Sequence, residues 1–206
     1  SLTVPTGITP VASGTLTARA EREEAANYHF SIEAARDFSA VLFEAHEQND
    51  DTVDGVALRT WFTPEHRRAA NITLNRASDA LGLFGELLGP PPYHEIDLVE
   101  VPTQRAAGVE LSGLILIASA YAANPDDVFY DIIVSHEMAH QWFYAGVGND
   151  VTESPWVDES VVTYLSNVFL ETFGEPGAAS GTLDAWDRAY DRAQTDDPTV
   201  SIASPV

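Results

Sequence analysis

The residues best suited to chemistry lie in one short run, His136-Glu137-Met138-Ala139-His140. Two histidines four residues apart on a helix project from the same face about one turn apart, so their ring nitrogens can share one metal ion. Glu137 points in a neighbouring direction and can reach a metal-bound water without being a ligand itself. This spacing predicts a zinc site in which Glu137 is the general base of a hydrolytic reaction.

A hydrolytic zinc site normally takes three protein ligands and a water, so a third ligand is needed. The chain has no cysteine, which leaves histidine and carboxylate ligands. A metzincin-type third histidine is excluded because Phe143 and Gly146 occupy the positions that this class requires. Glu159 follows His140 after eighteen residues and lies near the start of the next expected helix, which can turn back toward the metal. Asp158 is the alternative ligand, although on a helix it points about 100° away from Glu159.

The elements that must position these residues follow from hydrophobic periodicity and from helix-start signals. Expected strands cover residues 15–20, 28–32, 39–43, 55–62, 96–101 and 114–117, and residues 48–51 are expected to form a loop. Expected helices cover residues 63–88, 128–144, 154–174 and 183–193. Strands come first and helices later, which predicts an α+β fold.

The charge of the chain is strongly acidic, with 32 acidic residues against 10 basic ones, all arginine, and a net charge of -22. Nucleic acid is excluded as a partner because its phosphates would be repelled. The acidic residues are expected to form a solvated surface that supports solubility. The apolar runs are far shorter than the roughly 20 residues that cross a bilayer, so no membrane span is expected.

The chain also resembles a known family, the gluzincin aminopeptidases, which include alanyl aminopeptidase and leukotriene hydrolase. The resemblance covers about residues 93–174. Within the family, the sequence looks most like a divergent bacterial branch. It rests on the histidine motif, on the eighteen-residue spacing to Glu159, and on Trp156-Val157-Asp158-Glu159, which is similar to the family's Trp-Leu-Asn-Glu. The resemblance implies one zinc per chain, held by His136, His140 and Glu159.

Upstream, the run Ala107-Gly108-Val109-Glu110-Leu111 resembles the Gly-Ala-Met-Glu-Asn element of that family. By this alignment Glu110 matches the glutamate that binds the free amino group of the substrate, although Ala107 and Leu111 differ from the family's residues. The resemblance thereby implies an exopeptidase. Backbone groups of Ala107 and Gly108 are expected to bind the peptide as an added strand.

The function implied is that of a zinc-dependent aminopeptidase acting on peptides. Two alternatives stay open, a thermolysin-type endopeptidase and a non-catalytic zinc-binding module. The other histidines, His29, His46, His66 and His94, lack ligand partners at useful spacing and are expected on the surface or in packing. The sequence determines neither the oligomeric state nor the cellular location.

The resemblance also implies a division of the chain. Residues 1–62 would be the end of a β-rich amino-terminal domain, and residues 63–206 a thermolysin-like catalytic domain, truncated at its carboxyl end. The family's oxyanion-stabilising tyrosine lies downstream of the glutamate ligand. Tyr164 and Tyr190 fall inside expected helices, so this tyrosine is expected beyond the end of the chain.

Overall fold

Strands dominate the first part of the chain and helices the rest, within residues 1–196, which this computed structural model describes. The strands are β1 (Leu2–Pro5), β2 (Thr9–Ala12), β3 (Thr15–Glu21), β4 (Ala25–Ser31), β5 (Ala40–Phe43), β6 (Glu47–Val53), β7 (Val56–Phe62), β8 (Glu95–Val101), β9 (Gly108–Leu111) and β10 (Leu114–Ala118). The helices are η1 (Pro64–His66), α1 (Arg67–Leu88), α2 (Ser119–Ala122), α3 (Val128–Ala139), α4 (Trp156–Phe173) and α5 (Ala178–Asp196). Residues 197–206, the end of the expected catalytic domain, lie outside the described part.

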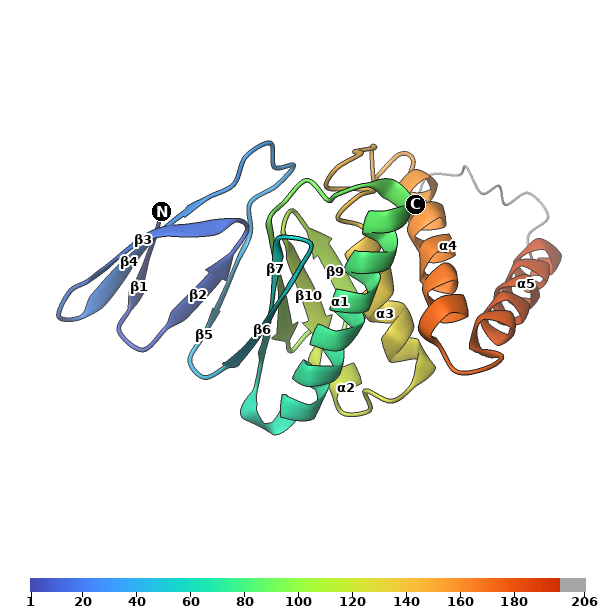
Figure 1. Ribbon diagram of the computed structural model, residues 1–206, viewed down its shortest axis with the longest axis horizontal. Helices are drawn as coiled ribbons and strands as arrows, with labels where there is room; N and C mark the ends of the chain where they lie inside the picture. Colours follow the sequence, from blue (N-terminus) through green and yellow to red (C-terminus); the bar gives the residue numbers. More distant parts are fainter. Residues whose placement is uncertain (197–206) are drawn as a thin grey trace.

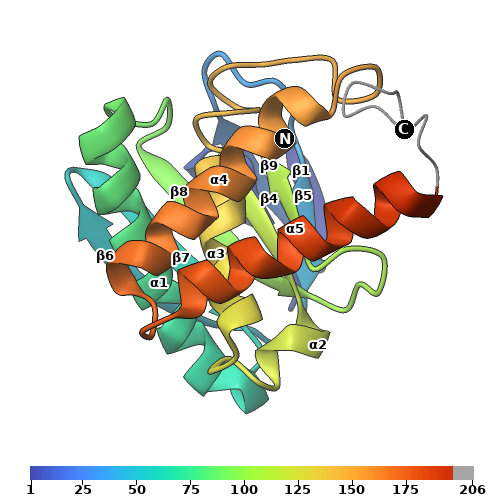
Figure 2. The same ribbon diagram turned by 90° about the vertical axis from the view of Figure 1, so that its right-hand side faces the viewer.

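The elements form layers along the long axis of the molecule (Figure 1). The small sheets β1-β4-β3 and β2-β5 lie at one end, and a five-stranded sheet of order β6-β7-β8-β10-β9 follows. In this sheet β7, β8 and β10 run parallel, while β6 and β9 are antiparallel edge strands. Helices α1 and α3 cover its outer face, and α4 and α5 cross in front of α3 (Figure 2).

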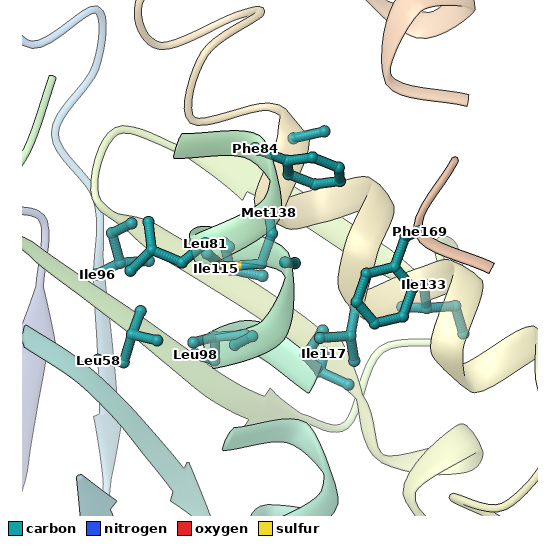
Figure 3. Close-up of a cluster of buried hydrophobic side chains, with 14 of the residues drawn as sticks. Leu58, Leu81, Phe84, Ile96, Leu98, Ile115, Ile117, Ile133, Met138 and Phe169 are labelled. Atoms are coloured by element: carbon teal, nitrogen blue, oxygen red, sulfur yellow. The ribbon is translucent and has the colours of Figure 1, made fainter. Parts of the chain in front are cut away.

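The central strand β8 is buried on both faces, as expected of a strand between two layers. Ile96 and Leu98 point toward the helices, and Val99 points toward the small sheets. Figure 3 shows the helix side of this core, where the sheet residues meet α1, α3 and α4 through Leu58, Leu81, Phe84, Ile96, Leu98, Ile115, Ile117, Ile133, Met138 and Phe169. The helix that carries the histidine motif is therefore anchored on the sheet by close packing.

Helix α1 lies close to the sheet because its buried face is built largely of small residues, Ala69, Ala70, Ala77 and Ala80. Pro64 stands at the start of η1, as the sequence predicts. Thr63 makes no side-chain cap, since its backbone N–H and its hydroxyl both donate to Glu100 Oε2, at 2.9 and 3.1 Å. Gly89 ends α1 with a φ of 88°, which a glycine adopts without strain.

The predicted combination of a β-rich part with later helices is confirmed, but several local predictions are wrong or incomplete. Residues 48–51 lie within strand β6 rather than in a loop. The strand escapes detection because it is a polar edge strand, stabilised by its backbone pairing with β7. The sequence does not indicate the short strands β1, β2 and β9, and α5 begins at Ala178, earlier than residue 183.

The motif helix α3 ends at Ala139, although the sequence predicts a helix as far as Tyr144. Beyond it the side chain of Gln141 pairs with the turn between β9 and β10: Gly113 N donates to Gln141 Oε1, and Gln141 Nε2 donates to Leu111 O, both at 3.1 Å. Tyr144 has a φ of 121°, which is incompatible with a right-handed helix. The chain therefore turns away directly after the second histidine.

The five-stranded sheet also continues across the domain boundary expected after Phe62. Strand β7 ends at this residue and pairs in parallel with β8, which belongs to the other side of the boundary. Both strands contribute to one hydrophobic core with α1 and α3. The β-rich part that is separate from this sheet is confined to β1–β5.

Candidate active site

Three side chains from two helices converge beside the sheet, and we call them the metal-ligand cluster: His136, His140 and Glu159. His136 lies in the last turn of α3 and His140 directly follows that helix, so the two rings lie side by side, edge to face, with centroids 5.0 Å apart. Glu159 comes from the first turn of α4, which packs on α3. Its carboxylate oxygens lie 3.2 Å from His136 Nε2 and 3.9 Å from His140 Nε2.

The protonation of His140 favours metal binding. Its Nδ1 lies 2.9 Å from the carbonyl oxygen of Phe143, and since a carbonyl only accepts, Nδ1 carries the proton. The lone pair of Nε2 then points into the cluster, and among residues 1–196 this buried atom has no hydrogen-bond partner. Burial lowers the pKa of His140, which keeps the ring neutral. A buried, unpartnered nitrogen facing a second imidazole and a carboxylate fits the donor set of zinc.

Glu159 and Asp158 have different surroundings, although they are neighbours in sequence. The hydrogen bond from His136 lowers the pKa of Glu159, which keeps its carboxylate ionised. Asp158 is buried and faces away from the histidines, where its Oδ1 accepts from Asn149 Nδ2 at 2.8 Å. The structure thus brings Glu159, and not Asp158, into the metal-ligand cluster.

Glu137 lies next to the cluster and is almost completely buried, with 6% of its surface exposed. Burial raises its pKa well above the ordinary value, and the nearby carboxylates of Glu110 and Glu159 raise it further. Its Oε2 has no hydrogen-bond partner within the described part of the chain. Buried polar atoms of this kind are usually satisfied by water or by a bound molecule.

Strand β9 forms the edge of the site opposite α3. Glu110 extends from this strand, and one of its carboxylate oxygens lies within 4.8 Å of ligand atoms of Glu137 and His140. Gly108, on the same strand, touches the general-base candidate so closely that an added Cβ would lie 2.4 Å from Glu137 Oε1. Glycine therefore leaves the room that the Glu137 carboxylate occupies.

A cavity of about 540 Å³ opens over these groups, between β9, α3, α4 and α5. Besides the polar residues it has an apolar wall that lies outside the predicted site residues: Phe129, Ile132, Ile133 and Trp186. The sequence contained a signal for the first three of these residues, because residues 129, 132 and 133 precede His136 at helical spacing and share its face of the helix. Trp186 comes from α5, and no motif marks it.

The other residues considered in the sequence lie elsewhere. Among the described residues, the candidate metal-binding groups include none of His29, His46, His66 or His94. Tyr164 and Tyr190 are exposed, by 64% and 56%, and neither lines the cavity. The helices of residues 1–196 are too short or too polar to cross a bilayer.

Comparison with known proteins places this geometry in context. Residues 72–203 match the model of the peptidase family M1 domain. The human aminopeptidase RNPEPL1 is 28% identical over 204 residues, which are 96% of this chain and 27% of that protein. Aminopeptidase 2 of Candida albicans is 30% identical over 119 residues, 54% of this chain and 13% of that protein. The chain thus spans less than a third of the length of either relative.

Solved structures share the fold. An M1 zinc metallopeptidase from Deinococcus radiodurans superposes with a TM-score of 0.74 at 20% identity, over 98% of this chain and 45% of that one. The E323A variant of an M1 zinc metallopeptidase from the same organism gives a TM-score of 0.70 at 21% identity, over 90% of this chain and 43% of that one. At such identity the likeness concerns the arrangement of strands and helices.

Proposed function

Because the chain belongs to peptidase family M1, we propose that it forms the zinc-binding and catalytic part of an aminopeptidase. One observation carries the proposal: His136 and Glu159 of the metal-ligand cluster line one cavity together with Glu110 and Glu137. Among residues 1–196, Glu137 Oε2 has no hydrogen-bond partner. The aminopeptidase relatives support the same reading.

The metal-ligand cluster would hold one zinc ion per chain. The fit rests on the free Nε2 of His140, on the adjacent His136 ring, and on the ionised carboxylate of Glu159. When bound, zinc would supply Lewis-acid chemistry, polarising the scissile carbonyl and acidifying a water molecule. Since three ligands come from the protein, room is left for water or substrate.

Glu137 would move the proton. It would accept a proton from the attacking water at its unpartnered Oε2 and pass it to the leaving amine. The close contact with Gly108 restricts where the carboxylate can lie.

Glu110 would bind the ammonium group of the substrate and so make the cut an exopeptidase cut. Its carboxylate faces Glu137 across the cavity, and no described cation pairs with it. Strand β9 is the edge of the sheet, paired on one side with β10. Its free side would accept an extended peptide, with backbone groups at Gly108 within reach.

The division of the chain is part of the proposal. Strands β1–β5 would be the end of an amino-terminal β domain, and the five-stranded sheet with its helices a thermolysin-like catalytic domain. Because β7 pairs with β8, we place β6 and β7 with the catalytic part rather than with the rest of residues 1–62.

The test is Glu110→Gln, assayed on the zinc-loaded chain with unblocked peptides and with the same peptides acetylated at the amino terminus. A charge-assisted hydrogen bond contributes about 1.5–3 kcal/mol, so catalytic efficiency on unblocked peptides should fall about ten- to a hundredfold. Zinc content should stay unchanged. Glu171→Gln, an exposed glutamate on the helix that carries Glu159, is the matched control and should behave as wild type.

The outcomes separate the alternatives. Wild-type efficiency of Glu110→Gln on unblocked peptides, together with cleavage of acetylated peptides, would establish the thermolysin-type endopeptidase instead. If the unsubstituted chain bound stoichiometric zinc but cleaved neither the unblocked nor the acetylated peptides, the non-catalytic zinc-binding module would be established instead.

A further inference from the structure

A dipeptide of the β-rich part, Arg36-Asp37, reaches the loops that surround the candidate active site, and we call it the clamp. It lies in the connection between β4 and β5, far from the histidine motif in sequence. Its hydrogen bonds end on three separate loop segments: the turn after β9, the turn after α3, and the connection to α4.

Arg36 contacts the two segments that follow α3. Its guanidinium lies 4.4 Å from the centre of the Tyr144 ring, a cation–π distance, and Nη1 donates to Tyr144 O at 3.5 Å. Nη2 donates to Asn149 O at 2.5 Å. One side chain thereby joins the turn after the second histidine to the loop that leads to α4.

The contact with Asn149 continues to the glutamate of the metal-ligand cluster. Asn149 Nδ2 donates to Asp158 Oδ1 at 2.8 Å and to Ser154 O at 3.1 Å, so its side chain secures the start of α4. Asp158 Oδ1 also accepts from the backbone N–H of Glu159 at 3.1 Å. The guanidinium therefore influences where Glu159 lies.

Asp37 contacts the strand that carries Glu110. Its carboxylate accepts from the backbone N–H of Ser112 at 3.2 and 3.3 Å and from the Ser112 hydroxyl at 3.2 Å. Ser112 is fully buried and follows β9 directly. The carboxylate also accepts from the Tyr144 hydroxyl at 3.0 Å. Asp37 thus links the Glu110 strand to the turn after His140.

Tyr144 has a backbone conformation that needs such support. A φ of 121° is unfavourable for a residue with a Cβ, and it persists only where surrounding contacts hold it. The contacts here are the guanidinium on its ring and the carboxylate on its hydroxyl. The ring also packs edge-on against His140, with centroids 6.2 Å apart.

From these contacts we infer that Arg36 and Asp37 are positioning residues of the active site. Arg36 holds the metal-ligand cluster in position, and Asp37 holds Glu110 in position relative to that cluster. The inference rests on the proposed function, because it assigns a purpose to the same site. Neither residue belongs to the metal-ligand cluster or lines the cavity, so both would act through Asn149, Tyr144 and Ser112.

The first experiment measures zinc affinity by competition with a chromophoric chelator. Arg36→Gln should weaken zinc binding about tenfold or more, the usual scale for groups that orient metal ligands. Arg36→Lys should also weaken it, since a lysine keeps the charge but lacks the planar group that reaches Asn149 and stacks on Tyr144. It serves as the second variant in case Arg36→Gln fails to fold.

Arg19→Gln is the matched control. Arg19 also stacks on a tyrosine, Tyr28 at 5.3 Å, and pairs with a carboxylate, Glu21, within the β-rich part and away from the site. Its loss should leave zinc affinity within about twofold of wild type, since a surface ion pair contributes little. Equal, unchanged affinities for the Arg36 variants and the control would overturn the inference.

The second experiment measures binding of an unblocked dipeptide amide to the zinc-loaded chain by calorimetry, in a Glu137→Gln background that prevents turnover. Asp37→Ala should weaken this binding about tenfold while zinc affinity stays within about twofold, because the carboxylate supports the Glu110 strand. Asp37→Asn, which keeps an acceptor oxygen, should recover part of the loss. Equal losses for the acetylated and unblocked peptides would overturn the assignment of Asp37 to Glu110.

The reference variant Glu159→Ala distinguishes a failure of the proposed function from a failure of the clamp inference. If Glu159→Ala kept wild-type zinc affinity, the proposed function would fail. If that variant lost zinc while the clamp variants kept it, the clamp alone would fail.

Discussion

Glu137 shows most clearly how single residues produce this site. A carboxyl group that is 6% exposed, with an oxygen that has no partner among residues 1–196, lowers the stability of the fold. Burial raises its pKa, and the carboxylates of Glu110 and Glu159 add to the effect. Nothing in the packing of α3 requires a charge here, since its neighbour Met138 belongs to the hydrophobic core. The proposed role in proton transfer would account for a carboxyl group at this position.

Glu137→Gln should therefore keep zinc and lose activity. The amide has nearly the same shape but cannot accept the proton of water, so turnover should fall at least about a hundredfold. Metal analysis checks that zinc is retained, and peptide hydrolysis on the same preparation checks that turnover is lost. Glu171→Gln, an exposed glutamate that does not line the cavity, is the control. Activity within a few-fold of wild type would remove Glu137 from the mechanism.

The proposed zinc ligands give a second prediction. Glu159→Ala should weaken zinc binding about a hundredfold or more, since a ligand matters at least as much as the groups that orient it. Asp158→Asn should bind close to one zinc, because Asp158 faces Asn149 and not the histidines. Chelator competition measures both. Wild-type affinity in Glu159→Ala, with loss in Asp158→Asn, would reverse the assignment of the two carboxylates.

For single residues, the sequence predicts those features of the site that depend on spacing within one helix. The four-residue separation of His136 and His140 determines their common direction, and the structure shows the two rings together. The separation of directions between Asp158 and Glu159 follows from the same helix geometry. Arg36 and Asp37 could not be found in this way, because their partners lie at least 75 residues away in sequence.

Elements with strong internal signals were predictable, and those stabilised by neighbours were not. Helix α1 has apolar residues at helical spacing, a proline in the short helix η1 that leads into it, and a glycine at its end. Strand β6 has the polar sequence Glu-Gln-Asn-Asp-Asp-Thr-Val, and its strand conformation depends on pairing with β7. Strand β9 has four residues, too few for alternation to stand out. The end of α3 depends on Gln141 bonding to the turn after β9.

Glu100 joins β8 to the start of the α1 region and makes the stability of the fold pH-dependent. Burial by itself would raise its pKa, but hydrogen bonds from the Thr63 backbone and from His66 are among those that outweigh it, and the pKa is lowered. A carboxyl group whose pKa is lower in the folded state stabilises the fold above its unfolded pKa. That stability is lost as the pH falls through the folded pKa.

Glu100→Gln should accordingly reduce the free energy of unfolding at pH 7 by about 1–3 kcal/mol, the scale for a buried charged hydrogen-bond partner. The difference from wild type should begin to shrink below about pH 4.3, where this carboxyl group becomes protonated in the unfolded chain, and should vanish as the pH falls through the lower pKa of the folded state. Urea denaturation from pH 7 to pH 3 measures it. Glu65→Gln, an exposed residue of the short helix η1, should change stability by less than about 0.5 kcal/mol. A pH-independent difference would exclude the charge as the cause.

At the scale of the whole molecule, the site depends on contacts between layers. The metal-ligand cluster comes from the helical layer, Glu110 from the edge of the sheet, and the clamp from the β-rich part. The family resemblance predicts a β-rich part followed by a catalytic part. It does not predict that the sheet crosses residue 62, because strand pairing over such sequence distances leaves no local pattern.

The net charge of -22 leads to the last prediction. An excess of one sign destabilises a compact state through self-repulsion, and salt screens this repulsion. Raising the ionic strength from 0.01 to 0.15 M shortens the screening length from about 30 to about 8 Å. We expect this change to raise the free energy of unfolding of the zinc-free chain by about 1–2 kcal/mol at pH 7.5. The thermal unfolding midpoint should rise by roughly 2–8 °C.

Two controls show whether screening is the cause. Sodium and potassium chloride should act equally at equal ionic strength, since screening depends on charge and concentration and not on the identity of the ion. Near pH 4.3, the isoelectric point of the sequence, repulsion is small and added salt should have little effect on the midpoint. Calorimetric scans at both pH values measure this. A midpoint that stays constant or falls with salt at pH 7.5 would mean that the acidic side chains are spaced too widely over the surface to oppose folding.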